Sequence, residues 1–147
     1  MNKSQAVVEK LNILLSSEML YYQNVRGYHW NIKGPQFFEL HMKFEELYNE
    51  AAAFADEVAE RILMLKGKPL HTYSDFLKHS IVKETSNVSK DSECVKNVVQ
   101  HSEKLLALVN EILEMATSNE DEGTMNLMSD QVNVIEARLW MFSSWLA

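Results

Sequence analysis

The stretch HWNIKGPQFFELHMKFE, residues 29–45, carries two histidines on either side of a Gly-Pro break. Gly34 and Pro35 are typical of a turn between helices, because glycine adopts conformations closed to other residues and proline suits the first turn of a helix. Apolar residues recur at steps of three and four on both sides of the break. The stretch therefore predicts two long helices joined by a tight turn, which brings His29 beside His41.

The same periodicity extends over the rest of the chain and predicts four long helices. The first stripe ends near Lys33, and the second runs from Pro35 to about Leu65, where Gly67 and a second proline stop it. A third stripe begins near Ser89, and a fourth follows the polar segment SNEDEG. No alternation typical of β-strands competes with these helices.

The connection between the second and third helices, Lys68–Val88, is too long for neighbouring antiparallel helices. Its segment YSDFLKHS predicts a short helix of its own. A long second connection is how ferritin-like bundles are joined. We therefore expect one all-α domain over residues 1–147, a ferritin-like four-helix bundle with a short extra helix between helices 2 and 3.

The composition and net charge of the chain exclude several classes of function. The chain is 46% hydrophobic, enough for a packed core, and its net charge of −7 repels nucleic acid, so direct DNA binding is not expected. Cys94 is the single cysteine and allows no intrachain disulfide. The N-terminus does not read as a signal peptide, and no apolar run reaches the roughly 18–20 residues that span a bilayer. We expect a cytoplasmic protein without membrane contact.

Candidate metal ligands lie on the second helix as two pairs with i, i+4 spacing. His41 and Glu45 form one pair and Asp56 and Glu60 the other, so each pair presents its side chains on one side of the helix. His29 joins the first pair through the tight turn. Imidazole with carboxylate suits iron or zinc.

The two pairs cannot bind one ion within one chain. His41 and Asp56 are 15 residues apart, about 22 Å along a helix axis. Two copies of the helix packed antiparallel about a two-fold axis would bring Asp56 and Glu60 of one chain opposite the histidines of the other, giving two identical sites per dimer. The alternative is that the acidic pair belongs to a solvated helix face.

A site within one bundle would use Glu-x-x-His on two helices. No glutamate here has a histidine three residues later. The sequence therefore argues against a di-iron centre inside the bundle.

The stretch HWNIKGPQFFELHMKFEELYNEAAAFADEVAERILMLKGKPL resembles the signature of the Dps family, the miniferritins named for DNA protection during starvation. The ending DEGTMNLMSDQVNVIEARLWMFSSWLA resembles that family's fourth helix. The resemblance implies a ferroxidase centre made of His29, His41 and Glu45 from one subunit and Asp56 and Glu60 from its two-fold partner. Glu45 departs from the aspartate of many members, and Trp30 resembles the family's tryptophan near the site.

The resemblance also implies the activity. Dps proteins are hollow dodecamers that bind Fe(II), oxidise it with hydrogen peroxide and store ferric mineral, which protects against oxidative damage. We expect the same here, with zinc as a substitute metal. Members that bind DNA commonly use a Lys/Arg-rich tail, and this sequence shows none.

Two roles are possible for several other polar residues. Glu46 and Glu50 extend an acidic strip on the second helix, which is either a mineral nucleation site or a solvated face. Acidic residues at the start of the fourth helix resemble the family's pore lining or favour the helix dipole: Asp121, Glu122 and Asp130, with Asn126 replacing a common aspartate. We interpret His71, Asp75 and His79 as surface residues, and His101 as surface or satisfied core. Arg61 is expected to orient a carboxylate or form a subunit salt bridge.

Overall fold

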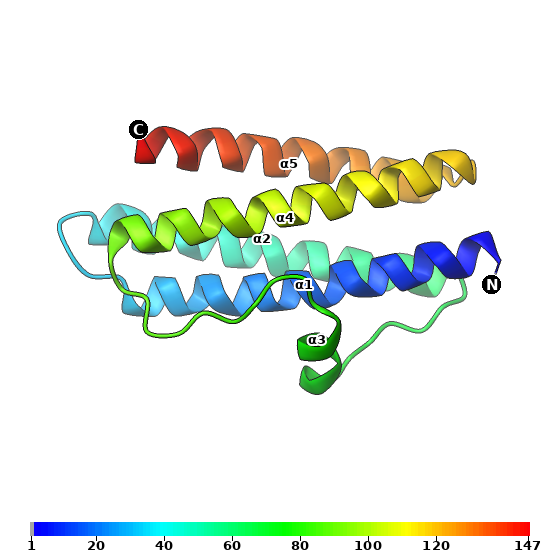
Figure 1. Ribbon diagram of the computed structural model, residues 1–147, viewed down its shortest axis with the longest axis horizontal. Helices are drawn as coiled ribbons and strands as arrows, with labels where there is room; N and C mark the ends of the chain where they lie inside the picture. Colours follow the sequence, from blue (N-terminus) through cyan, green and yellow to red (C-terminus); the bar gives the residue numbers. More distant parts are fainter. Residues whose placement is uncertain (1) are drawn as a thin grey trace.

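The computed structural model describes residues 2–147 and consists of five helices, shown in Figure 1. Four long helices lie side by side as a bundle, and a short helix, α3, stands beside α1. Their bounds are α1 Lys3–Asn31, α2 Phe37–Met64, α3 Tyr73–His79, α4 Asp91–Ser118 and α5 Glu122–Leu146. The predicted ferritin-like bundle with an extra helix in its long connection is confirmed.

The turn between α1 and α2 is built by Gly34, whose φ of +118° favours glycine. The N–H of Phe37 donates to the carbonyl of Gly34 at 3.1 Å and starts α2. The expectation that Pro35 lies in the first turn of this helix was wrong by two residues, because Pro35 and Gln36 complete the turn. The N–H of Lys33 instead donates to the carbonyl of Ser89, which ties this corner to the segment before α4.

The long connection is held along α1 by two asparagines. The Asn12 side chain donates to the carbonyl of Lys68 and accepts from the N–H of Leu70. Asn24 does the same further along α1, with the carbonyl of Lys83 and the N–H of Thr85. Each amide thus satisfies one donor and one acceptor of the connection, Asn12 before α3 and Asn24 after it.

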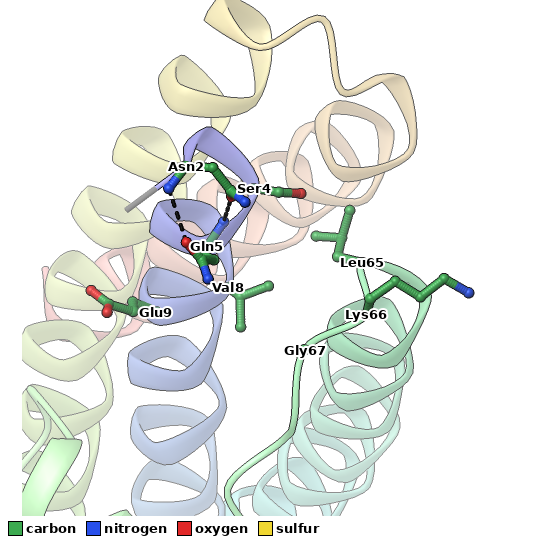
Figure 2. Close-up of a pocket in the computed structure, with 8 residues that line it drawn as sticks. All are labelled: Asn2, Ser4, Gln5, Val8, Glu9, Leu65, Lys66 and Gly67. Atoms are coloured by element: carbon green, nitrogen blue, oxygen red, sulfur yellow. Dashed lines mark hydrogen bonds between the residues drawn. The ribbon is translucent and has the colours of Figure 1, made fainter.

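The core follows the apolar stripes, which meet along the bundle axis. Its fully buried members come from all four long helices and include Leu11, Leu14, Tyr21, Phe44, Ile62, Leu105, Ile112, Met128 and Ile135. At the end of the bundle where α1 begins, Gly67 lies so close to Val8 that an added Cβ would come within 2.6 Å of a Val8 methyl carbon. Figure 2 shows this junction, which borders a hollow of about 600 Å³ between the start of α1 and the end of α2.

The same end of the bundle is joined by an ion pair. Arg61 on α2 donates to Asp121 at 2.7 Å and to the Thr124 hydroxyl at 3.0 Å, so its partner is in the same chain. Asp121 also caps α5 by accepting from the N–H of Thr124. Burial favours the neutral Asp121 carboxyl, but the hydrogen bonds from Thr124 and Arg61 outweigh it and hold the pKa of Asp121 below its usual value.

No helix among residues 2–147 combines the length and the apolar character needed to cross a bilayer.

Asp121→Ala should destabilise the fold, because it removes the cap of α5 and the partner of Arg61. We expect a loss of about 1–2 kcal/mol in the free energy of unfolding at neutral pH, measured by urea denaturation. The lowered pKa means that this contribution is present above the unfolded pKa of about 3.9 and disappears as the pH falls through the folded value. Asp130→Ala, an exposed change on the same helix, is the control. Equal effects of the two changes at neutral pH would contradict the assignment.

Candidate metal centre

His29 and His41 hold each other through reciprocal hydrogen bonds. Nδ1 of His29 lies 2.6 Å from the backbone carbonyl of His41, and Nδ1 of His41 lies 2.7 Å from the carbonyl of His29. A carbonyl oxygen only accepts, so both Nδ1 atoms carry the proton and donate. In the neutral imidazoles the lone pair is therefore on Nε2, the atom left free to bind a metal.

These bonds exist because of where the two histidines fall on their helices. The carbonyl of His29 is one of the last four of α1, which have no partner within the helix. The His41 imidazole satisfies it from the first turns of α2. The turn at Gly34 reverses the chain between the two, so the local sequence alone brings both rings together.

Aromatic contacts fix the ring planes. The His29 and His41 rings stack at 3.8 Å between centroids, and Phe37 stacks on the other side of His41 at 4.8 Å. Tyr48 meets His29 edge-on at 5.3 Å. His29 is only 7% exposed, so its ring has little freedom to turn away.

Glu45 completes one end of the candidate site. Its Oε1 lies 3.8 Å from Nε2 of His29, and its side chain is 56% exposed. The structure therefore stacks His29 on His41, as the spacing predicted, and brings the exposed Glu45 carboxylate toward Nε2 of the buried His29.

Asp56 and Glu60 lie further along α2 and do not reach this cluster. Both are exposed, and within residues 2–147 no three His, Cys, Asp or Glu side chains gather closely enough to hold a metal ion. The five predicted ligands thus fall into two separate groups. The first is the buried His29 at the end of α1 with His41 and Glu45 of α2, and the second is the exposed pair of Asp56 and Glu60 further along α2.

The exposed face of α2 that carries these ligands has small residues at its middle. Ala52 and Ala53 are exposed there, between the two groups of ligands. Four larger apolar side chains are exposed near the ends of the helix: Phe38, Met42, Leu63 and Met64, of which Met42 and Leu63 are 66% and 56% exposed.

Several other candidate residues form ion pairs within the chain. Glu46 pairs with Lys43 at 3.1 Å, and Glu50 pairs with the buried Arg138 at 3.1 Å. Asp121 is taken by the cap of α5 and by Arg61. The remaining acidic or polar residues at the start of α5 are exposed: Glu122, Asn126 and Asp130.

The histidines outside the site differ from one another. His71 is exposed, and His79 donates from Nδ1 to the backbone carbonyl of Asp75 rather than to its carboxylate. Of the two interpretations of His101, the surface position is wrong and the core position is right: the side chain is buried, and its Nδ1 has no partner among the described residues. Burial lowers the pKa of His101 to about 4, with a smaller effect of Lys104.

Sequence reasoning missed the charged residues inside the bundle, Glu18 and Arg138, which are 1% and 3% exposed. The signal was present, because Glu18 continues the stripe of Leu11 and Leu14, and Arg138 lies three residues after Ile135. A charged residue in register with an apolar stripe predicts a buried charge.

Three comparisons place these features among known proteins. Residues 8–147 match the family model of the ferritin-like domain. The chain is 36% identical to DNA protection during starvation protein 2 of Bacillus anthracis, covering 99% of both chains. It superposes on the crystal structure of a Dps protein from Vibrio cholerae with a TM-score of 0.97 and 42% identity, covering 99% of this chain and 91% of that one. That protein is described as a member of a broad superfamily of ferritin-like diiron-carboxylate proteins.

A further match is the Dps of Listeria innocua, in a structure soaked with zinc. Its TM-score is 0.93 at 28% identity, and the alignment covers 95% of each chain.

His41→Ala should lower stability even without metal, because the His29 carbonyl then loses its donor and the ring stack is broken. We expect a loss of about 1–2 kcal/mol in the free energy of unfolding, measured by chemical denaturation with a chelator present. Glu45→Ala is the matched control, since this exposed carboxylate has only the 3.8 Å approach to His29. If the two variants had the same stability, the reciprocal hydrogen bonds would not be structural.

Proposed function

The chain belongs to the Dps family of ferritin-like proteins, and we propose that it is an iron-storage ferroxidase that oxidises Fe(II), preferably with hydrogen peroxide. The observation that carries the proposal is the pair of imidazoles whose Nδ1 protons are held by backbone carbonyls, which leaves both Nε2 atoms for a metal beside Glu45. Imidazole and carboxylate oxygen together suit iron. Iron is the substrate and the stored product.

A second copy of the chain completes the proposed site. Glu45 lies seven residues before Ala52 and Glu60 seven residues after Ala53, so a two-fold axis between the two alanines places the partner subunit's Glu60 opposite Glu45. The partner subunit's Asp56 lies one turn further inward. Small side chains at the centre let two helices approach closely. The proposed ligands are then His29, His41 and Glu45 with the partner's Asp56 and Glu60.

The same axis accounts for two exposed apolar side chains. Met42 lies ten residues before Ala52, and Leu63 lies ten residues after Ala53, so each would face the other across the axis. Large exposed apolar side chains at symmetric positions are what an interface between like chains requires. They support antiparallel pairing of α2 independently of the charged ligands.

The chemistry follows from the donor set. Carboxylates favour Fe(III) over Fe(II), while few protein ligands leave positions open for the oxidant. Two Fe(II) ions give one electron each, and hydrogen peroxide takes both electrons and two protons to become two molecules of water. Both reactants of hydroxyl radical formation are consumed in the same step, which is the basis of the proposed protection against oxidative damage.

The family relationship supports further parts of the proposal. We infer a hollow homododecamer of about 204 kDa from subunits of 17.0 kDa, with two intersubunit sites in each dimer and ferric mineral stored inside. Zinc is proposed as a substitute for iron, as the zinc-soaked relative suggests. The proposed location is the cytoplasm. With a formal charge of −7 per chain, direct DNA binding is not part of the proposal.

The activity is tested by loading the protein with Fe(II) without oxygen and then adding hydrogen peroxide once. We expect rapid appearance of ferric absorbance with an equivalent loss of peroxide, about one peroxide for two iron ions, because the site delivers one electron from each ion. The same experiment on the His29→Ala/His41→Ala variant is the control. A bundle that only binds protein partners would match that control, which would contradict the ferroxidase assignment.

The sharing of the site is tested by mixing two inactive variants. One lacks His29 and His41, and the other lacks Asp56 and Glu60. After unfolding, mixing and reassembly, a mixed dimer holds one native site, because the intact acidic pair of the first chain meets the intact histidines of the second. Activity should return to roughly a quarter of wild type if pairing is random. No recovery in verified mixed assemblies would place all five residues in sites within single chains.

A further inference from the structure

Arg138 links all four long helices from inside the bundle. From α5, one of its terminal nitrogens donates to Glu50 of α2 at 3.1 Å, and the other donates to the Ser102 hydroxyl of α4 at 3.3 Å. Its guanidinium carbon lies 4.9 Å from the centre of the Tyr21 ring on α1. Only Glu50 reaches solvent, with 45% of its side chain exposed.

Glu18 is buried in the same region without a hydrogen bond. Neither of its carboxyl oxygens has a partner among residues 2–147, and the same holds for the Tyr21 hydroxyl and for Nε of Arg138. Buried polar atoms are almost always hydrogen-bonded, either to protein or to ordered water. Four such atoms on three residues around one guanidinium indicate a hydrated polar site rather than isolated defects.

The charges in this site do not balance if Glu18 is ionised. Arg138 carries one positive charge, and the Glu50 carboxylate already compensates it at 3.1 Å. A second carboxylate would leave a net negative charge inside the bundle, where an uncompensated charge is costly. Burial raises the pKa of Glu18 to about 7, Arg138 opposes this, and Glu50 adds to it.

Two charged groups from neighbouring helices shift the pKa of Glu18, Arg138 of α5 and Glu50 of α2. Tyr21 of α1 is neutral, α4 contributes the uncharged Ser102 as the acceptor of Arg138, and no charged side chain of α3 takes part. Burial is the largest influence on the pKa of Glu18, and Arg138 opposes it while Glu50 adds to it.

A route to solvent leads through the pair of Arg138 and Glu50. Both residues line a groove of about 240 Å³ between α2 and α5, together with Glu46 and Phe142. The groove reaches Arg138 from outside, and Arg138 continues inward to Tyr21 and the neighbourhood of Glu18. The Arg138–Glu50 pair therefore lies between this groove and the buried ring of Tyr21, which is one helical turn from Glu18 on α1.

We propose that the centre of the bundle is a proton-binding site, in which Glu18 carries an exchangeable proton, ordered water completes the hydrogen bonds of Glu18, Tyr21 and Arg138, and the Arg138–Glu50 pair connects the site to solvent. The ligands of this site are the proton and water. It lies apart from the five proposed iron ligands and does not depend on the proposed ferroxidase activity.

The protonation of Glu18 is tested by infrared spectroscopy of the assembled protein with isotope-labelled glutamate, titrated from about pH 5 to about pH 9. We expect the carbonyl stretch of a buried protonated carboxylic acid at the acidic end, lost near neutral pH and absent from Glu18→Gln. Exchange into heavy water should shift this band without denaturant, because the groove gives access. A wild-type protein without this band at acidic pH would overturn the proposal.

The coupling is tested with two surface variants that leave Glu18 in place. Glu50→Gln frees the positive charge of Arg138, so the titration midpoint of Glu18 should fall by about one unit or more. Glu46→Gln is the matched control, because Glu46 lies on the same helix and pairs with Lys43 instead. An unchanged midpoint in Glu50→Gln, or an equal shift in both variants, would overturn the proposal even if Glu18→Gln fails to assemble.

Stability provides a second readout with a defined sign. The folded pKa of Glu18 is raised from 4.5 to about 7, so the folded protein holds this proton more tightly than the unfolded chain. Relative to Glu18→Gln, wild-type stability should be highest below the unfolded value and should decline as the pH rises through the folded one. A difference between the two proteins that does not change over this range would contradict a proton on Glu18.

Discussion

The two hydrogen bonds exchanged by His29 and His41 are the contact on which the candidate site depends. Each ring satisfies a backbone carbonyl of the other residue, so the end of α1 and the beginning of α2 are joined by the same groups that are proposed to bind iron. A metal ligand usually needs a separate partner to fix its tautomer. Here each histidine is that partner for the other, with the backbone as acceptor. The same two hydrogen bonds therefore join α1 to α2 and fix the tautomers of the two proposed histidine ligands.

The length and rigidity of α2 set the second constraint. The helix runs from the corner with the histidines to the end that Arg61 fixes to α5, and His41 and Asp56 lie 15 residues apart along it. A bend tight enough to unite them would break the core stripe from Phe44 to Ile62. Within the proposal, association of two chains is thus the only way to bring all five side chains together.

Periodicity was sufficient to predict the four long helices, because the stripes are long and both prolines fall between them together with Gly34 and Gly67. It failed at Pro35, where turn geometry at Gly34 delays the helix by two residues. It could place His29 beside His41, since the turn is local, but could not show that backbone carbonyls hold the rings. Periodicity also could not identify Arg61 as the partner of Asp121, because the two residues are 60 positions apart in the sequence. Glu18 and Arg138 could be recognised as charges on apolar stripes, yet the contacts of Arg138 with Glu50, Ser102 and Tyr21 depend on the packing of four helices.

The carboxylates of this bundle lie in two different environments. On the outer face of α2, Glu45, Asp56 and Glu60 are exposed and stay available for a cation. The guanidinium of Arg138 inside the bundle already pairs with the half-exposed Glu50, and the buried Glu18 lies within range of the same positive charge. A metal ion placed among these two glutamates would meet a fixed positive charge at close range, where repulsion is strong in a low dielectric. The absence of a Glu-x-x-His motif and the presence of Arg138 thus both argue against an iron site inside the bundle, and the proposed acidic ligands lie instead on the exposed face of α2.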